Sequence, residues 1–224
     1  LNAMFVMMNA ARLHVALQGI GLLDAAWQKA DAYSKERRQM RAPGARDTSL
    51  IQDHPAMRRI LDTQRAWIDG GRVLAYRTAL ELDLLKHHPD AGRRDAAQRW
   101  CSLVTPVMKA AFTHQAFYGA SECLQVFGGH GYVREWGIEQ IVRDARVAMI
   151  YEGTNEIQAI DLLVRKVLPD GGAWSAVTDP VPPIPDTFGA RFEVLPDAKA
   201  GHDTLFLIGG FLGGFLLPMV GLSF

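Results

Sequence analysis

The amino-acid sequence predicts an all-α protein, an up-down bundle that is four-helix-bundle-like. Apolar residues recur at helical spacing along three long runs, 4–40, 54–87 and 91–127, and strand-like alternation is nearly absent. Long helices joined by short connections pack beside one another in antiparallel order. With 224 residues, of which 49% are hydrophobic, the chain is long enough for one or two domains with a sizeable core.

The three long helices are expected to bury one face each. We assign these apolar side chains to the core: Leu61, Ile68, Val73, Leu74, Trp100, Val104, Met108 and Phe112. Pro106 lies inside the third run and is expected to kink it, because proline lacks an amide donor and its ring crowds the preceding turn.

Two shorter helices are expected after the long runs. Residues 137–147 combine apolar side chains at helical spacing with charged side chains around them. A further helix begins near Thr154, whose hydroxyl suits an N-cap, and its end near Lys166 is basic. Glu152 therefore stands on the connection between two helices.

Glu152 is the candidate catalytic residue, placed like a general base. A carboxylate between two rigid helices can reach into a cleft, and Gly153 beside it allows a ligand to approach the main chain. The glycines of segment 125–132 permit a similar approach at the end of the third long helix. A structural interpretation is also open, because a glutamate before a helix is usually solvated and paired glycines often only end a helix.

Several motifs follow one another along the chain. They are Gln-x-x-Gly-Gly-x-Gly-Tyr at 125–132, Arg-Asp-Ala-Arg at 143–146 and Ile-Tyr-Glu-Gly-Thr-Asn-Glu-Ile-Gln at 150–158. Upstream stand Asn-Ala-Ala-Arg at 9–12 and Tyr-Ser-Lys-Glu-Arg-Arg-Gln at 33–39. This ordered set resembles the C-terminal helical bundle domain of acyl-CoA dehydrogenases, and the resemblance covers positions 4–168.

The resemblance implies an FAD-dependent oxidation of acyl-CoA to trans-2-enoyl-CoA. Glu152 matches the residue that removes the α-proton of the thioester while the β-hydrogen leaves as hydride to the flavin. The family polarises the thioester carbonyl with the main-chain amide of that glutamate and a flavin ribityl hydroxyl, which stabilises the developing negative charge. Electrons then pass to an electron-transferring flavoprotein.

The resemblance also assigns binding roles. The cofactor-binding candidates are Arg37, Gln39, Gln125, Gly128, Gly129, Thr154 and Glu156, and the substrate-binding candidates are Arg12 and Gly153. Of these, Gln125, Gly128 and Gly129 would approach the FAD of a neighbouring subunit, which implies a homodimer or homotetramer. An arginine such as Arg37 suits the FAD pyrophosphate because its planar fork donates two hydrogen bonds to oxyanions.

Some positions depart from the family pattern. Met40 and Arg41 stand where the more common sequence is Phe-Gly, and His54 stands near where many members have a flavin-contacting glutamine. The long loop 42–52 favours the larger subgroup with a C-terminal extension, similar to methylthio-propionyl-CoA dehydrogenases. Since the family builds its pocket between this domain and two upstream regions, we expect the chain to be a fragment that supplies the base and is inactive alone.

Three alternative functions stay open at this point. An acyl-CoA oxidase would reoxidise the same flavin with oxygen. A non-catalytic helical oligomerisation module would use the bundle only for self-association. A membrane-anchored interaction protein would insert the apolar tail.

Composition excludes some partners and compartments. The 24 acidic and 24 basic residues balance, so no basic excess favours nucleic acid. Cys101 and Cys123 lie in apolar helical runs, which predicts free thiols in a reducing compartment such as the bacterial cytoplasm. Neither cysteine has metal-ligand spacing and the seven histidines form no cluster, so no metal site is predicted.

The character of the chain changes after Leu168. Residues 169–204 are rich in glycine and proline and are expected to be an irregular linker. Residues 205–224 contain no charge and have glycines at the spacing used where membrane helices touch. Pro218 inside this stretch opposes a membrane span, and we favour an unnatural tail that results from truncation or a shifted reading frame.

Overall fold

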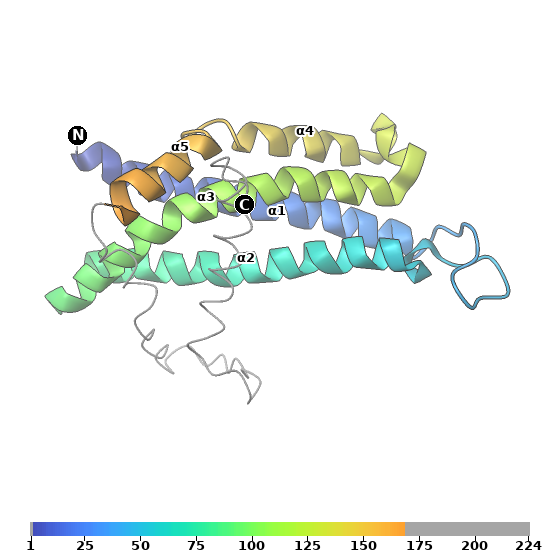
Figure 1. Ribbon diagram of the computed structural model, residues 1–224, viewed down its shortest axis with the longest axis horizontal. Helices are drawn as coiled ribbons and strands as arrows, with labels where there is room; N and C mark the ends of the chain where they lie inside the picture. The colour runs from blue at the N-terminus through green and yellow to red at the C-terminus, as the bar shows by residue number, and fades with distance from the viewer. Residues whose placement is uncertain (1, 169–224) are drawn as a thin grey trace, which may run out of the picture.

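The computed structural model describes residues 2–168 and confirms the all-α bundle. Three long helices, α1 (Asn2–Ser34), α2 (Pro55–His87) and α3 (Ala91–Phe127), run side by side in alternating directions. The shorter α4 (Ile138–Ala148) returns along α1 and α3 (Figure 1). The arrangement is the predicted up-down order, with α3 in contact with every other α-helix.

Short helical elements complete the described chain. They are η1 (Ile51–Asp53), η2 (Gly128–Tyr132), η3 (Arg134–Trp136), α5 (Asn155–Ile160) and the π-helical η4 (Asp161–Val167). Because η4 continues α5 directly, the two form the single helix predicted from Thr154 to Lys166, and both pack on α3.

The first helix ends earlier than predicted. We expected it to continue to Met40, but α1 stops at Ser34. The chain then pairs with itself in antiparallel fashion: the Gln39 amide donates to the Ser49 carbonyl (3.1 Å) and the Ser49 amide to the Met40 carbonyl (2.9 Å). Met40 adopts a left-handed φ of 57°, which no helix accommodates. These hydrogen bonds make 37–50 a closed loop instead of two more helical turns.

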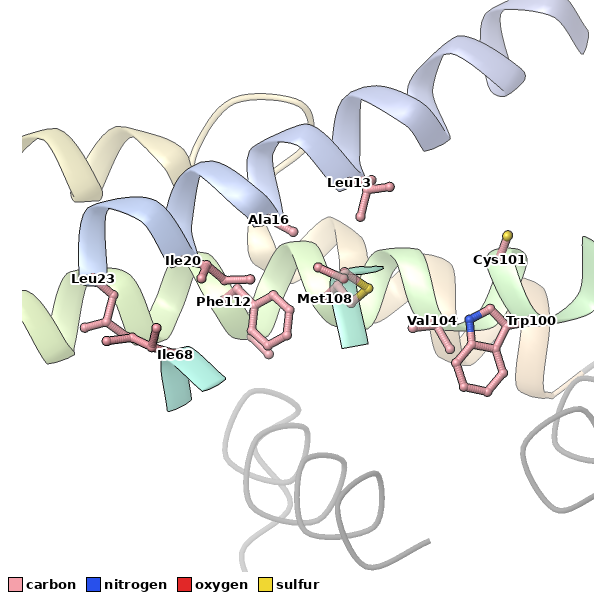
Figure 2. Packing of buried hydrophobic residues seen from close by; sticks show 12 residues of the cluster. Leu13, Ala16, Ile20, Leu23, Ile68, Trp100, Cys101, Val104, Met108 and Phe112 are labelled. Carbon is pink, nitrogen blue, oxygen red and sulfur yellow. The ribbon is translucent and has the colours of Figure 1, made fainter. Parts of the chain in front are cut away.

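The core lies between α1, α2 and α3 (Figure 2). Ile68, Trp100, Met108 and Phe112 are buried there, as the periodicity predicts. Val73 was wrongly assigned to the core, because it is 64% exposed. Its position five residues after Ile68 turns it to the opposite side of α2.

Two of the long helices approach each other closely at Gly19. A Cβ atom at this position would lie 2.8 Å from the carbonyl oxygen of Phe112, so the main chains of α1 and α3 touch there. Gly21, on the outer side of the same helix, has nothing within 4 Å of such an atom. The α1–α3 contact therefore requires glycine at 19 but not at 21.

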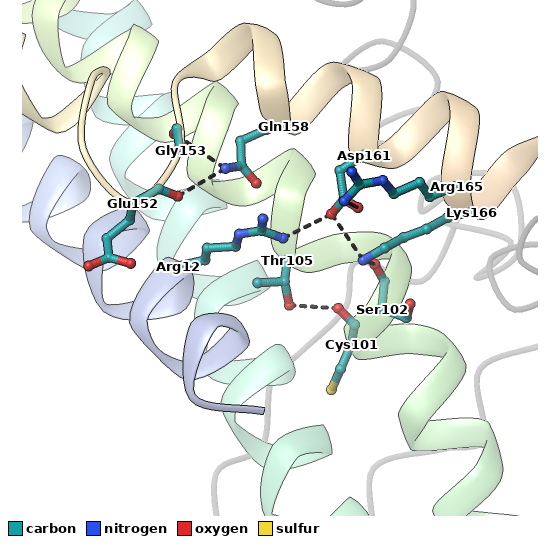
Figure 3. Close-up of polar contacts among 10 residues, drawn as sticks. All are labelled: Arg12, Cys101, Ser102, Thr105, Glu152, Gly153, Gln158, Asp161, Arg165 and Lys166. Carbon is teal, nitrogen blue, oxygen red and sulfur yellow. Dashed lines mark hydrogen bonds and ion pairs between the residues drawn. The ribbon is translucent and has the colours of Figure 1, made fainter. Parts of the chain in front are cut away.

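The third helix bends in its N-terminal half, where Pro106 lies (Figure 1). Proline cannot donate to the carbonyl four residues earlier, that of Ser102. Lys166 supplies the missing donor, with its Nζ 2.6 Å from the Ser102 oxygen, and Thr105 Oγ1 donates to the Cys101 carbonyl at 2.6 Å (Figure 3). The bend is thus stabilised by a contact from η4.

Both cysteines are buried free thiols, as expected. Burial raises the pKa of each to about 12, with Glu81 adding to the effect at Cys101 and Glu122 at Cys123. No helix within residues 2–168 combines the length and apolar character that crossing a membrane demands. The predicted linker 169–204 and apolar tail 205–224 lie outside the described residues.

We predict that Gly19→Ala lowers the free energy of unfolding by about 1–3 kcal/mol, because its methyl group meets an immobile carbonyl. The matched variant Gly21→Ala is expected to raise it by about 0.5–1 kcal/mol, since alanine is the better helix former. Urea unfolding of both variants checks this. Equal effects of the two substitutions would show that α1 and α3 do not touch at Gly19.

Candidate functional site

Glu152 lies on the connection between α4 and α5, residues 149–154, and its side chain is exposed. Glu152 and Gly153 both adopt left-handed backbone conformations, with φ of 56° and 86°. This conformation is strained for a glutamate and persists only where its surroundings enforce it. Figure 3 shows the Glu152 carboxylate pointing away from Gln158, on the side of α1.

Hydrogen bonds from three elements enforce this conformation. Lys109 of α3 donates from Nζ to the Gly153 carbonyl at 2.6 Å. Gln158 of α5 donates from Nε2 to the carbonyls of Glu152 (3.1 Å) and Gly153 (3.3 Å), as Figure 3 shows. Tyr151 donates its hydroxyl to the side-chain oxygen of Gln18 on α1. The connection is therefore fixed to α1, α3 and α5 at once.

Thr154 caps α5, as predicted, since its Oγ1 accepts from the Ile157 amide at 3.4 Å. A hydrogen bond with the Thr154 side chain, followed by one with its own main-chain amide, holds the pKa of Glu156 below its usual range. Glu156 is exposed, so it and Thr154 form a polar edge beside Glu152. Asn155, by contrast, is buried and accepts from Lys109 Nζ at 3.1 Å.

Arg12 is 6% exposed and has an internal partner. Its Nη1 lies 2.9 Å from Asp161 Oδ2, and Asp161 also faces Lys166 at 3.4 Å and Arg165 at 3.6 Å. Figure 3 shows the guanidinium directed to Asp161 and not to the Glu152 carboxylate. Arg12 therefore joins α1 to η4, close to the candidate base but turned from it.

The glycine-rich turn follows α3 at the far end of the bundle. Gly128 needs its φ of 58°, while Gly131 packs so closely that a Cβ atom would lie 2.7 Å from the Leu124 carbonyl. Gly129 has neither constraint, because a Cβ atom there would have nothing within 4 Å. Gln125 beside it is exposed. The main chain at Gly129 is therefore open to an approaching group.

Arg37 and Gln39 lie at this same end of the bundle, on the loop after α1 (Figure 1). Both side chains are exposed, and the Gln39 carbonyl is 2.9 Å from His54 Nε2. Tyr33, near the end of α1, joins the two regions through its hydroxyl, 2.9 Å from His130 Nδ1 of the glycine turn. The candidate residues thus fall into two groups: Arg37, Gln39, Gln125, Gly128 and Gly129 at one end, and Arg12, Glu152, Gly153, Thr154 and Glu156 at the α4–α5 connection.

Sequence reasoning missed Lys109 and Gln158, the two residues that hold the connection. One signal for Lys109 was present, because it interrupts the apolar run from Val104 to Phe112, and a buried charge requires partners. Lys109 is fully buried. No group of three or more potential metal ligands occurs among residues 2–168.

Comparisons with known proteins identify the family. The chain matches the acyl-CoA dehydrogenase C-terminal domain over residues 1–167 and therefore belongs to the acyl-CoA dehydrogenase family. It is 44% identical over 174 residues to the 3-methylmercaptopropionyl-CoA dehydrogenase of Ruegeria pomeroyi, covering 77% of this chain and 29% of that enzyme.

Solved structures agree on the fold. Caenorhabditis elegans ACDH-11, in complex with C11-CoA, superposes with a TM-score of 0.66 at 26% identity, covering 76% of this chain and 27% of that one. Arabidopsis thaliana acyl-CoA oxidase 1 also superposes with a TM-score of 0.66, at 20% identity, covering 82% of this chain and 27% of that one. The fold itself therefore does not separate dehydrogenases from oxidases. The chain spans less than a third of each of these proteins.

We predict a pH-dependent contribution of Lys109 to stability. Burial lowers its pKa to about 8, with repulsion from Arg12 adding to the effect and attraction to Glu156 and Glu152 opposing it. Its ordinary pKa is 10.5, so between these values the unfolded chain binds more protons at this site than the folded chain. The stability of wild type relative to Lys109→Met is therefore expected to rise with pH across this window.

Urea unfolding of wild type and Lys109→Met at about pH 8 and about pH 10 measures this difference, because methionine has no proton to lose. A difference that stays constant with pH would contradict the lowered pKa.

Proposed function

We propose that this chain supplies the catalytic base of an acyl-CoA dehydrogenase, and that the base is Glu152. The observation that carries the proposal is the connection 149–154, where an exposed carboxylate sits on a strained, firmly anchored turn. Strain that is enforced from several sides is typical of functional sites. Membership of the acyl-CoA dehydrogenase family supports proton abstraction as the chemistry of this carboxylate.

The reaction begins at the α-carbon of the acyl thioester. Glu152 takes the α-proton on a carboxylate oxygen, and the electrons of the broken C–H bond form the new α–β double bond. Bound FAD would supply the acceptor for the β-hydrogen and its electron pair. The product is a trans-2-enoyl-CoA, and the two electrons pass on to an electron-transferring flavoprotein.

Developing charge on the thioester oxygen needs a hydrogen-bond donor. The main-chain amide of Glu152 donates to no other group among residues 2–168, so it is available for this role. A donor fixed in position before the reaction stabilises an enolate-like oxygen without reorganisation. Gly153 adds no side chain, which leaves room for the thioester beside the base.

The two groups of candidate residues suit two FAD molecules. Arg37 and Gln39 would contact cofactor phosphates, and Gln125, Gly128 and Gly129 would contact the FAD of a neighbouring subunit. Thr154 and Glu156 would contact the flavin that serves Glu152. This division implies a homo-oligomer, dimer or tetramer, in which each subunit completes the cofactor site of another.

The substrate is an acyl-CoA thioester. Arg12, which is 6% exposed and paired with Asp161, would lie near this substrate and the catalytic base, as the family resemblance implies. The Ruegeria pomeroyi relative, named for 3-methylmercaptopropionyl-CoA, makes that thioester the first substrate to test. The identity of 44% to a dehydrogenase also favours dehydrogenase over oxidase chemistry.

A chimera tests the role of Glu152. Residues 1–168 replace the matching segment of the Ruegeria pomeroyi enzyme, and anaerobic bleaching of the flavin by 3-methylmercaptopropionyl-CoA is followed by stopped flow. We predict that Glu152→Gln slows flavin reduction about 10²–10⁴-fold, because the α-proton loses its acceptor. The control Asp83→Asn, which removes an exposed carboxylate on α2, is expected to change the rate by less than about twofold. Reduction of Glu152→Gln at the rate of the unmutated chimera would refute the assignment.

A further inference from the structure

Lys109 is the largest fully buried side chain in the described part of the chain. It sits in the middle of α3, beside the core residues Met108 and Ala111. An ammonium in such surroundings loses its hydration and is retained only where hydrogen bonds replace the lost water. Lys109 therefore needs hydrogen-bond acceptors at fixed positions around its ammonium.

The partners of Lys109 are neutral oxygens. Nζ donates to the Gly153 carbonyl at 2.6 Å and to Asn155 Oδ1 at 3.1 Å, and no carboxylate within residues 2–168 lies at ion-pair distance from it. Asn155 is itself fixed, because its Nδ2 donates to the Ala110 carbonyl at 3.2 Å and its Oδ1 accepts from Thr113 at 3.2 Å. The ammonium is thus aimed at the main chain directly after Glu152.

Gln158 reaches the same turn from α5. Its Nε2 donates to the carbonyls of Glu152 and Gly153, and a Cβ atom at Gly153 would lie 2.7 Å from this nitrogen. Gln158 is 1% exposed, so its amide has little freedom to point elsewhere. Together, Lys109 and Gln158 occupy the carbonyls of both left-handed residues.

We propose that Lys109 and Gln158 are positioning residues, which hold the carbonyls of Glu152 and Gly153 and thereby aim the Glu152 carboxylate at the substrate. This inference rests on the proposed role of Glu152 as base. A carbonyl oxygen lies in the peptide plane that follows its residue, so holding the Glu152 and Gly153 oxygens fixes the two planes after Glu152. These planes fix the Cα atom from which the Glu152 carboxylate extends. Without the hydrogen bonds to these oxygens, the strained turn is free to relax to an ordinary conformation.

Lys109→Met in the chimera tests the proposal. Methionine keeps the apolar stem and removes the ammonium. We expect flavin reduction to slow about 10²-fold, because a small displacement of the base weakens proton transfer strongly. The dissociation constant for acyl-CoA is expected to change by less than about threefold, since the positioning concerns the reacting atoms and not the bulk of the ligand.

Lys166→Met is the matched control. Lys166 Nζ also donates to a main-chain carbonyl at 2.6 Å, that of Ser102, but it holds the bend of α3 instead of the turn at Glu152. Its loss is expected to lower thermal stability and to leave the rate of flavin reduction within about twofold. Equal slowing by both substitutions would show that Lys109 acts only through general stability and would overturn the proposal.

Gln158→Met provides a second variant should Lys109→Met fail to fold. Hydrogen exchange of the 224-residue chain gives a readout without activity. Around the turn, the amides of Tyr151 and Asn155 donate to the carbonyls of Val147 and Met149. In either variant, exchange is expected to rise at these two amides while the middle of α3 stays protected. Unchanged exchange at both amides would overturn the proposal.

The chimera also separates the two hypotheses. Failure of the proposed function appears as full activity of Glu152→Gln. Failure of the positioning proposal appears as full activity of Lys109→Met while Glu152→Gln is inactive.

Discussion

The arrangement of the site depends on the hydrogen bond from Lys109 to the Gly153 carbonyl. It crosses from the middle of the longest helix to a turn 44 residues later, and it fixes a pair of left-handed residues that would otherwise relax. The cost of burying an ammonium in the core is offset by its hydrogen bonds to the Gly153 carbonyl and to Asn155 Oδ1. The packing of α3 against α1 and α5 therefore influences where the Glu152 carboxylate points.

A second polar cluster fixes η4 to α1 and α3. Arg12, Asp161 and Lys166 connect α1 to η4, and Lys166 continues to the Ser102 carbonyl that Pro106 leaves without a donor. The bend of α3 and the position of the last helix are thus set by the same contacts.

The helices could be predicted from the sequence because their signals are local. Periodicity gave α3 its bounds, and Thr154 marked the start of α5. The predicted end of α1 was wrong because the main-chain pairing between Gln39 and Ser49 leaves no trace in the pattern of side chains. Lys109 and the ion-pair partner of Arg12 were missed for a related reason. The partner of Lys109 is 44 residues away and that of Arg12 is 149 residues away, so neither contact shows in any short segment.

The most direct measurement is a crystal structure of the chimera with a bound, non-reacting acyl-CoA analogue. We expect a Glu152 carboxylate oxygen about 3–3.5 Å from the α-carbon, with the Glu152 amide hydrogen-bonded to the thioester oxygen and the left-handed turn unchanged. A carboxylate turned from the α-carbon, or another acidic side chain in its place, would contradict it.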